Sequence, residues 1–351
     1  MMWRRENHLI ASHSQTGARF HRFAHAFFTF GNERGCVKRE LRPEELRQLV
    51  YICNLYYIQG LSQHEISKKM FVSRPQISKL LAKARKHNIV SIHINDPFSR
   101  EHEVGDALVK KYHLDNAVVV DVGEKSYEEA LALVAKTSSL IVTSHIANGQ
   151  TIGIAAGLTV AACSEHLNMY NCTDLMFVPL IGGQSFEGES WYANNNCQRF
   201  ATRMQERYMV LNSPMVVRNE HARRELQGDD SIHPVLDRYN HLDVILLGVG
   251  QVEKDATLGK CPIGLEEIDW CRERGAKAII GASFIDAGGN ETLHEKSDLF
   301  VGIKGQQILQ CKKVITFVVG RKKIEAVEAV LKGGFVNTLC IDMDTAKILV
   351  E

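Results

Sequence analysis

The sequence predicts an α/β protein of two domains, a small helical domain near the N-terminus and a larger domain built on an open parallel sheet. Three observations support this prediction. The chain has 351 residues, enough for two domains. Its charge is unevenly divided, with 16 basic and 6 acidic side chains in residues 1–95 and 26 and 35 in residues 96–351. Beyond residue 101, short β-branched runs alternate with helical stretches.

The overall charge of +1 hides this asymmetry, because +10 in the first part (16 − 6) nearly cancels −9 in the second (26 − 35). A basic domain joined to an acidic one is typical of proteins that bind a polyanion through one end. The apolar fraction of 45% and the charged fraction of 24% exclude wholesale disorder. No apolar run approaches the length of a transmembrane helix, so no membrane partner is expected.

The nine cysteines include no Cys-x-x-Cys pair, so neither a metal site nor a redox motif is predicted. An odd number of cysteines without a secretory signal favours reduced thiols and a cytoplasmic location.

Residues 1–40 are expected to lie outside the folded domains, as an unstructured extension or as a stretch added by an upstream start codon. They are rich in arginine and phenylalanine and hold three acidic residues. A transit peptide has a similar composition, and this alternative stays open. Because helical periodicity begins only after Pro43, we expect residues 1–36 to be dispensable for folding and DNA binding.

Residues 41–95 are predicted to form a small helical domain. Apolar residues from Leu46 to Tyr57, including Leu49 and Val50, recur at spacings that place them on one buried face, and Gly60 ends that helix. A second helix, running to Met70, opens with a capping box in which Ser62 and Glu65 satisfy each other's backbone N–H groups.

A three-residue break separates this second helix from a third. Ser73 can cap the third helix, and Pro75 suits its first turn. The helix runs to His87, and the alternating stretch 89–94 predicts a short strand. Asn95-Asp96-Pro97 then marks the domain boundary. The core between the last two helices is expected to consist of Ile66, Met70, Val72, Ile77 and Leu80.

Two short helices joined by a tight turn are the pattern of a helix-turn-helix, whose second helix enters the major groove of DNA. Between Leu61 and Asn95 the chain has seven basic residues and one acidic residue. Glutamine suits adenine and arginine suits guanine, so double-stranded operator DNA is the predicted partner. A symmetric homo-oligomer is also expected, because one such module covers a half-site. The predicted DNA-binding residues are Ser62, Gln63, Ser73, Arg74, Pro75, Gln76, Ser78, Lys79 and Lys83, with Lys68, Lys69, Arg85 and Lys86 nearer the phosphates.

The larger domain, residues 96–351, alternates strands and helices. This order implies an open parallel sheet covered on both faces. The predicted strands are 117–120, 175–180, 244–249, 277–281 and 314–319, and the predicted helices include 127–147, 158–167, 264–274 and 323–332.

Glycine-rich loops follow several predicted strands, where ligands of such sheets gather. The segment from Gly153 through Gly157 to Thr159 joins a strand to a helix, and a helix N-terminus favours a phosphate. Asp286 could accept hydrogen bonds from sugar hydroxyls, and Lys323 follows Arg321 and Lys322 in a cationic loop suited to phosphate. The alternative is structural, because such glycines and Asp286 also fit ordinary turns. Gly182, Gly183 and Gly248 complete the predicted effector-binding set.

The segments from Tyr57 to Ser67 and from Val72 to Leu81 closely resemble the DNA-binding domain of the SorC family of bacterial transcriptional regulators. The resemblance continues over roughly residues 41–351 and includes the segment from Leu331 to Ala346. It implies a winged-helix-like domain followed by a Rossmann-like domain similar to sugar-phosphate isomerases and deaminases. It further implies binding of a small phosphorylated sugar and assembly as a dimer or tetramer.

The family's phosphate loop, Gly-x-Ser-x-Gly-x-Thr, matches this chain at Gly153, Gly157 and Thr159. Its acidic position matches Asp286 and its late lysine matches Lys323. Two positions depart from the family: Ala155 replaces the serine, and Val319 stands where a glycine is preferred.

Together these observations predict an effector-controlled DNA-binding regulator of a carbohydrate-utilisation operon, with no cofactor and no catalytic residues. A sugar-phosphate isomerase or deaminase fused to a DNA-binding domain is the alternative, but isomerisation needs a positioned acid and base. His145, His166, His233 and His241 are isolated and belong to no such motif. A constitutive DNA-binding protein with a decayed pocket also stays open, because of Ala155 and Val319.

Overall fold

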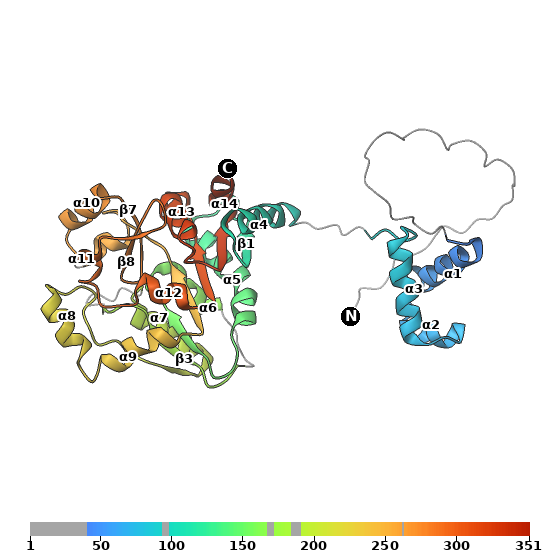
Figure 1. Ribbon diagram of the computed structural model, residues 1–351, viewed down its shortest axis with the longest axis horizontal. Helices are drawn as coiled ribbons and strands as arrows, with labels where there is room; N and C mark the ends of the chain where they lie inside the picture. Colours follow the sequence, from blue (N-terminus) through green and yellow to red (C-terminus); the bar gives the residue numbers. More distant parts are fainter. Residues whose placement is uncertain (1–40, 93–97, 167–171, 184–190, 262) are drawn as a thin grey trace, which may run out of the picture. The chain divides into compact units, whose positions relative to one another are not determined.

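The computed structural model describes residues 41–92, 98–166, 172–183, 191–261 and 263–351. The leader, residues 1–40, and the predicted boundary at Asn95-Asp96-Pro97 lie outside the described residues. By its contacts the chain forms two compact units, which meet between Ile94 and Asn95. Figure 1 shows the helices and strands of each unit.

All regular elements in the described part of the first unit are helices. Gly60 has a φ of +70°, which glycine adopts without strain, and the first helical segment ends just before it as the sequence predicts. The unexpected feature is one π-helical turn within that segment, directly after α1. The elements are α1 (Pro43–Cys53), the π-helical η1 (Asn54–Ile58), α2 (Gln63–Met70) and α3 (Arg74–Lys86).

The capping box of α2 is confirmed. Ser62 Oγ accepts the backbone N–H of Glu65 at 3.3 Å, and the Glu65 carboxylate accepts the backbone N–H of Ser62 at 2.8 Å. The helix ends at Phe71, which is left-handed with a φ of 52°. At α3 the expectation is met in part, since Ser73 occupies the N-cap and Pro75 the first turn, but the Ser73 side chain makes no capping hydrogen bond.

The core of this unit confirms the predicted apolar set and extends it. Ile66 and Ile77 are fully buried, and the other three predicted residues pack against them while partly exposed. The core also includes Leu49 and Ile52 of α1, which packs against α3. One expectation for α1 is wrong: Leu46 and Val50 are 43% and 42% exposed, because the buried stripe of this helix runs through Leu49 and Ile52 instead.

The predicted strand at 89–94 is also wrong over its described part. Residues 89–92 form bends and irregular backbone, and 93–94 lie outside the described residues. A strand needs a partner for its backbone groups, and the described part of this unit offers none. The alternation of apolar residues instead reflects Ile89 and Val90 packing on the helical core.

The second unit confirms the predicted parallel sheet. Its main sheet has seven strands in the order β1-β11-β10-β5-β2-β3-β4, and every neighbouring pair is parallel. The strands are β1 (Asn116–Val120), β2 (Thr151–Ile154), β3 (Met176–Pro179), β4 (Arg207–Tyr208), β5 (Val244–Gly248), β10 (Val314–Val318) and β11 (Thr338–Asp342).

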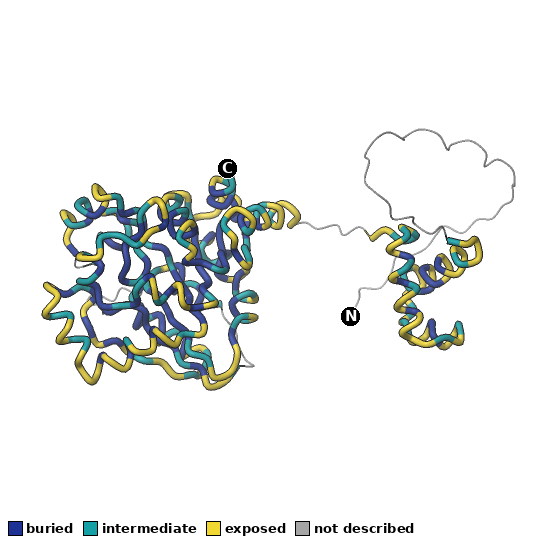
Figure 2. The backbone as a smooth tube through the Cα atoms, viewed as in Figure 1, coloured by how far each residue is buried: buried dark blue, intermediate teal, exposed yellow. Residues whose placement is uncertain are grey.

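Helices cover both faces of this sheet (Figure 1). One layer contains α5, α6 and α7, which pack side by side, and the other contains α4, α13 and α14. Strands β10 and β11, which both lie inside the sheet, are buried along their whole length, and Figure 2 shows the buried backbone concentrated between the layers. These helices are α4 (Ser99–Tyr112), α5 (Tyr127–His145), α6 (Leu158–His166), α7 (Ala193–Met204), α13 (Ile324–Lys332) and α14 (Met343–Val350).

A second, antiparallel sheet lies outside the sequence prediction. The predicted strand 277–281 is β7 (Ala276–Ile280), but it pairs antiparallel with β8 (Ser283–Asp286) rather than joining the main sheet. The reason is local, because Gly281, with a φ of +53°, and Ala282 form a two-residue hairpin turn. The sheet is completed by β6 (Gly250–Gln251) and β9 (Glu291–Thr292), in the order β6-β7-β8-β9.

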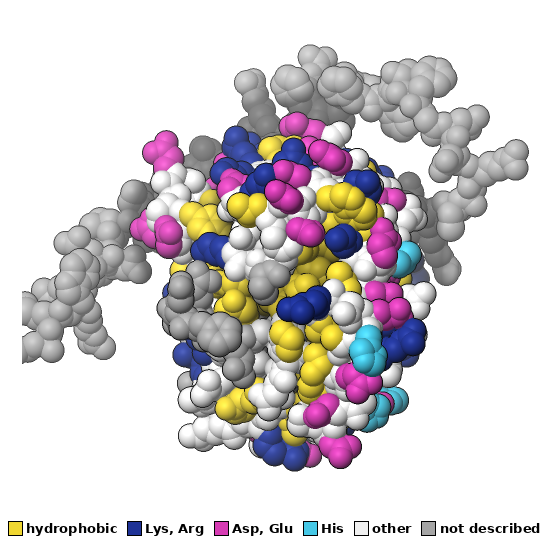
Figure 3. Space-filling view, turned by 90° about the vertical axis from the view of Figure 1, so that its left-hand side faces the viewer, with side chains coloured by type: hydrophobic (Ala, Val, Ile, Leu, Met, Phe, Trp, Pro, Cys, Tyr) yellow, Lys and Arg dark blue, Asp and Glu magenta, His cyan; other side chains and the backbone are white. Residues whose placement is uncertain are grey.

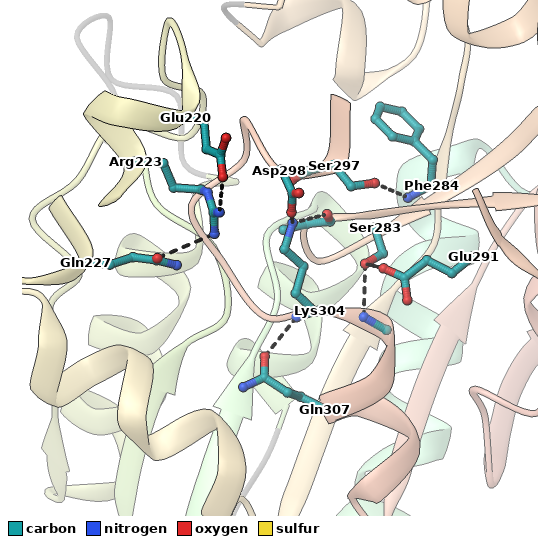
Figure 4. A network of polar contacts seen from close by, with 12 residues as sticks. Glu220, Arg223, Gln227, Ser283, Phe284, Glu291, Ser297, Asp298, Lys304 and Gln307 are labelled. Carbon is teal, nitrogen blue, oxygen red and sulfur yellow. Dashed lines mark hydrogen bonds and ion pairs between the residues drawn. The ribbon is translucent and has the colours of Figure 1, made fainter. Parts of the chain in front are cut away.

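A polar network fixes this second sheet to the following helix (Figure 4). Ser283 Oγ donates to the Glu291 carboxylate and accepts the backbone N–H of Gly305 at 2.9 Å. Lys304 Nζ donates to the Ala282 carbonyl at 3.3 Å and pairs with Asp298 at 3.4 Å. Burial lowers the pKa of Lys304, although Asp298 opposes that shift. Because Ser283, Glu291, Lys304 and Asp298 each have a partner, we assign these contacts a structural role.

The remaining elements are shorter and lie at the periphery. They are α8 (Glu220–Gln227), α9 (His233–Asp237), α10 (Leu265–Glu273), α11 (His294–Ser297) and α12 (Gly305–Gln310), with the 3₁₀ turns η2 (Arg238–His241), η3 (Thr257–Lys260) and η4 (Arg321–Lys323). The eight cysteines in the described ranges form no disulfide. Within those ranges, no helix is both long and apolar enough to span a membrane.

Candidate functional site

The exposed face of α3 carries most of the predicted DNA-binding residues. Ile77, Leu81 and Ala84 are buried against the core, so the opposite side of the helix faces solvent. Gln63, on α2, is half-buried. The predicted residues that lie exposed are Ser62, Ser73, Arg74, Pro75, Gln76, Ser78 and Lys79.

Lys83 is the member of the predicted set whose side chain is already engaged. Its ammonium group forms an ion pair with Glu45 of α1, and this hydrogen bond lowers the pKa of the Glu45 carboxyl. The pair joins α1 to α3. Lys83 therefore has a structural contact between two helices, and its contact with DNA stays a prediction.

The other cations of this face remain available to an anion. Arg74, Lys79, Arg85 and Lys86 are exposed, and within the described ranges none of them has an acidic partner. Unpaired cations along one side of an exposed helix are the arrangement that attracts and positions a phosphate backbone.

The second candidate site is a cavity of about 620 Å³ in the second unit. It is lined by the carboxyl ends of β2, β5 and β10, which reach residues 155–159, 248–251 and 319–323. The lining also includes Ile181, Trp191, Met215 and Phe300, which belong to a hydrophobic cluster separate from the main core. Figure 3 shows one face of this unit, with hydrophobic surface running between charged side chains.

The loop between β2 and α6 lines this cavity, and hydrogen bonds hold it in place. Gly157 has a φ of +125°, a conformation that strains other residues, and its N–H donates to the Trp191 carbonyl at 2.7 Å. The buried amide of Asn196 on α7 donates to the carbonyls of Ala155 at 3.0 Å and Gly157 at 3.3 Å. These contacts fix the N-terminus of α6, whose first N–H groups have no partner inside the helix.

Gly248, the last residue of β5, lies close to the loop between β2 and α6. A Cβ at that position would stand 3.3 Å from the carbonyl oxygen of Ala156 and 3.6 Å from Thr159 Oγ1. A side chain would be tightly packed at this position, so glycine eases the close approach of the two strand ends. Thr159 is buried in the first turn of α6 and lines the cavity.

Lys323 is the cation of the site. Its two neighbours are paired at the surface, Arg321 with Asp344 at 2.8 Å and Lys322 with Asp255 at 3.6 Å. Lys323 lines the cavity, and its ammonium group has neither an ion pair nor a hydrogen bond to any described residue. The residue is half-buried, and burial lowers the pKa of its ammonium group. A partly desolvated cation without a counter-ion is costly, and an anionic ligand would relieve that cost.

The loop that carries Lys323 is fixed from both sides. The N–H of Gly320 donates to the Asp342 carboxylate at 2.8 Å, and the same carboxylate caps α14 through the N–H of Thr345 at 2.9 Å. The Gln251 side-chain amide donates to the Lys322 carbonyl at 2.7 Å. The position of Lys323 is therefore set before any ligand arrives.

The structure thus brings together four of the eight predicted effector-binding residues. Gly157, Thr159, Gly248 and Lys323 line the cavity. Both positions that depart from the family pattern, Ala155 and Val319, line it too.

The three other predicted glycines lie outside the described lining and have packing roles instead. A Cβ on Gly153 would come within 2.6 Å of Leu180, and one on Gly182 within 2.7 Å of the Pro214 carbonyl. Gly183 has a φ of +113°, and its Cβ would meet the ring of Tyr192 at 2.9 Å. These glycines let neighbouring segments approach and do not face the ligand space.

Asp286 is a turn residue. Its carboxylate accepts the N–H groups of Gly288 and Asn290, each at 2.9 Å, and lies outside the described cavity lining. Hydrogen bonding, first of all from the backbone N–H of Asn290, lowers its pKa. These contacts fit the structural interpretation, and contact of Asp286 with a sugar stays a prediction.

Sequence reasoning missed the groups that position the cavity. Asn196 and Asn194 are buried on α7, and Asn194 holds the Gly183 carbonyl at 3.2 Å. A run of three asparagines at a helix start, Asn194 to Asn196, was the available indication, since asparagine is uncommon inside buried helices. Across the residues that the structure describes, no group of three or more His, Cys, Asp or Glu side chains could hold a metal ion.

This architecture defines a class of protein, in which a helix-turn-helix unit precedes a Rossmann-like unit with a ligand cavity at the carboxyl ends of its strands. Comparison with known families identifies the second unit. The family named Sugar-bind and described as "Putative sugar-binding domain" matches residues 96–351. The chain belongs to this family and is a SorC-family transcriptional regulator.

Individual relatives cover the helix-turn-helix unit as well. The deoxyribonucleoside regulator of Bacillus subtilis is 27% identical over 308 residues, 88% of this chain and 98% of the relative. The sorbitol operon regulator of Klebsiella pneumoniae is 26% identical over 311 residues, 88% of this chain and 99% of the relative. The crystal structure of the full-length Klebsiella regulator, SorC, has a TM-score of 0.69 and 26% identity, and the match covers 87% of this chain and 99% of that one.

Proposed function

We propose that this protein regulates a carbohydrate-utilisation operon, that its first unit binds operator DNA, and that a small phosphorylated sugar bound in its second unit controls this binding. The observation that carries the proposal is Lys323, a half-buried cation without a described counter-ion in a cavity at the ends of three parallel strands. The names of the relatives, which refer to deoxyribonucleosides and sorbitol, support a carbohydrate signal.

In the proposed mechanism, the phosphate of the effector lies between Lys323 and the N-terminus of α6. The ammonium group supplies the positive charge, and the free N–H groups of the first turn supply oriented donors. Thr159 adds a hydroxyl, while Gly157 and Gly248 leave room for the phosphate to approach the backbone. A phosphate bound here would compensate the charge of the Lys323 ammonium group, which water reaches only in part.

On the DNA, we propose that α3 enters the major groove and that Arg74 and Gln76 reach base edges from its first turn. Lys79, Arg85 and Lys86 contact phosphates and add affinity without sequence information. One unit covers a half-site, so we propose that the protein acts in the cytoplasm as a homodimer or larger homo-oligomer on repeated half-sites.

Control requires the effector to distinguish two states. An effector shifts the binding equilibrium only by its differential affinity for the DNA-bound and free forms. In the proposal, filling the cavity changes how the second units assemble and thereby how the two recognition helices are spaced.

We further propose that the cavity binds its ligand without converting it. Isomerisation of a sugar phosphate needs an acid and a base at the sugar carbons. Asp255 is the one carboxylate in the described lining, and it is paired with Lys322. Incubation of the protein with a sugar phosphate, followed by chromatography, separates the two functions: a regulator returns the ligand unchanged, and steady conversion would favour the enzyme.

The central test is a thermal-shift screen of sugar phosphates, followed by operator binding with and without each hit, because ligand binding to the native state raises its apparent stability. Lys323→Met should abolish the shift, whereas the matched variant of an exposed lysine outside the cavity, Lys312→Met, should retain it. Operator binding that ignores every phosphorylated sugar would favour a constitutive DNA-binding protein.

A further inference from the structure

Phe71, in the turn between α2 and α3, has no packing role in the structure. It is 96% exposed, and it does not pack against the helical core, although its neighbours Met70 and Val72 do. In the described part of the chain, its ring takes part in no aromatic pair and in no contact with a cation. A single exposed apolar side chain is common on protein surfaces, so exposure alone decides nothing.

The backbone at Phe71 is the second unusual feature. The N–H of Val72 donates to the Ser67 carbonyl at 3.1 Å, and that of Phe71 donates to the Lys68 carbonyl at 3.4 Å, which is the Schellman pattern of a helix end. This pattern requires a left-handed residue, and Phe71 has a φ of 52°. Glycine is the usual residue there, because a side chain strains this conformation.

The other left-handed residues of the described chain differ from Phe71. Some are polar, among them Asn88 and Asp174, whose residue types adopt this conformation readily. Leu293 is apolar, but it packs against the hydrophobic cluster of the second unit. Within the described ranges, Phe71 is therefore the one left-handed apolar residue outside every hydrophobic cluster. A strained residue that contributes nothing to packing is a candidate for a functional role.

The charges around Phe71 favour an anionic partner. Lys68, Lys69 and Arg74 are exposed, and none of them forms an ion pair with a described residue. Residues 66–88 include no acidic side chain. DNA offers both kinds of contact, because its phosphates attract the cations and its thymine methyl groups and deoxyribose rings are apolar surfaces that a phenyl ring can cover.

We propose that Phe71 is a DNA-contacting residue, whose ring packs on an apolar group of the operator beside the bases that α3 reads. Phe71 lies three residues before Arg74, the first residue of α3, and the proposed function places that end of α3 in the major groove. DNA that covers the ring removes it from water, which offsets the strain of the turn. The inference rests on the proposed function, and it adds an apolar contact to the polar and charged ones.

The experiment uses the full-length protein and a duplex that this protein selects from a random-sequence pool. Phe71→Gly removes the ring and relieves the strain, so it should weaken binding to the selected duplex by roughly threefold to thirtyfold. Asn88→Gly, the matched change at another exposed left-handed position, should bind as the wild type does. Unchanged DNA affinity in the Phe71→Gly protein would overturn the inference.

Thermal unfolding checks that the ring does not act through the fold. Phe71→Gly should not lower the melting temperature, because the ring packs on no part of the described core. Phe71→Asn repeats both measurements with a residue that tolerates the left-handed backbone and leaves the unfolded chain less freedom than glycine does. A lower melting temperature in both variants would show that the ring stabilises the folded chain, and it would contradict the proposal.

Uracil-substituted DNA identifies the apolar group. Replacing every thymine of the selected duplex by deoxyuridine removes the methyl groups and keeps the hydrogen-bonding edges of the bases. If the ring packs on a thymine methyl, the wild type should lose more affinity on this duplex than the Phe71→Gly protein does. If the ring packs on deoxyribose, both proteins should lose the same amount. Either result supports a DNA contact, since Phe71→Gly binds the original duplex more weakly in both cases.

Failure of the inference and failure of the proposed function look different. If the wild-type protein selects no duplex from the pool, the proposed DNA-binding function is wrong. If it selects a duplex that Phe71→Gly binds equally well, the function stands and the role of Phe71 alone is wrong. Sedimentation without DNA gives one more outcome: a changed assembly state in the Phe71→Gly protein would place the ring between copies of the chain and would refute the DNA contact.

Discussion

The recognition helix and the effector cavity both present lysines, but in opposite environments. Lys79 on α3 is exposed and has no acidic partner in the described part of the chain, so water compensates its charge. Lys323 is half-buried in the cavity lining, and burial lowers the pKa of its ammonium group. The first arrangement suits a large polyanion that approaches from solvent. The second suits a small anion that takes the place of water.

The two sites also differ in how the chain builds them. The DNA-facing surface comes from one helix and its turn, a stretch of about thirteen neighbouring residues whose spacing is set by helical geometry. The cavity takes residues from three strand ends, from β7 and from the loop before α7, which are far apart in the sequence. Substitutions should therefore act independently in the two sites, and the following predictions test that separation.

The largest effect is expected at Lys323. Lys323→Met should weaken binding of a phosphorylated effector by roughly ten- to hundredfold, because charge-assisted hydrogen bonds to the phosphate are lost. Operator affinity without effector should stay as in the wild type, since Lys323 lies in the second unit. Titration of operator release against effector measures both quantities, and Lys312→Met is the matched control.

Next in size is the loss of sequence discrimination at Gln76. Gln76→Ala should reduce the preference for operator over random DNA by roughly 1–3 kcal/mol, because one pair of base-edge hydrogen bonds is removed. Gln48→Ala, at an exposed position on α1, is the control and should bind as the wild type does. Competition binding at fixed salt provides the measurement. Unchanged discrimination in the Gln76 variant would show that another part of α3 faces the bases.

The phosphate-contacting cations should change affinity without changing specificity. Lys86→Ala should weaken operator and random DNA to the same degree and lower the salt slope of binding by about one unit. Lys83→Ala should have a smaller effect on DNA than Lys79→Ala, because Lys83 is already paired with Glu45. A salt series for each variant distinguishes these outcomes, and a larger effect at Lys83 would restore it to the DNA-binding surface.

The pH dependence of the cavity follows from the lowered pKa of Lys323. A folded-state pKa below the unfolded value means that the unfolded chain binds more protons in that interval, so stability without effector should rise with pH there. Effector binding favours the charged ammonium group, so effector affinity should fall over the same interval. Titrations between about pH 7 and pH 10 test both signs. Lys323→Met should remove both trends.

The smallest effect is expected at Asp286. Because its carboxylate is used in its own turn by Gly288 and Asn290, Asp286→Ala should leave effector affinity and sugar preference within error of the wild type. Calorimetric titration with the best effector measures this. A changed sugar preference would mean that the turn rearranges toward the cavity when ligand binds.

Sequence reasoning predicted most of the fold because the necessary information is local. The capping box at Ser62 and the proline at position 75 place two helix starts, and β-branched runs such as 314–319 correctly mark buried strands. The predictions are wrong where the structure of a segment depends on another segment with which it pairs. Residues 89–92 alternate like a strand but have no strand to pair with, and the run at 277–281 joins a different sheet because a two-residue turn folds it back on β8.

In the candidate site, too, local features could be predicted from the sequence, and features that depend on distant residues could not. Gly157 and Lys323 were recognisable because a glycine before a helix and a cation after a strand each have a local chemical meaning. Asn196 and Met215 were not, because their roles depend on segments that meet only in the folded chain.

The sequence by itself therefore determined the order of helices and strands, the basic recognition helix and the glycine loop before α6, since each depends on residues a few positions apart. Only the tertiary structure decided which glycines line the cavity and that Asp286 serves its own turn. The physical reason is that burial and pairing are properties of residues distant in the chain. The sequence shows which side chains are charged. Whether water or a ligand compensates that charge depends on which other residues surround the side chain in the folded protein.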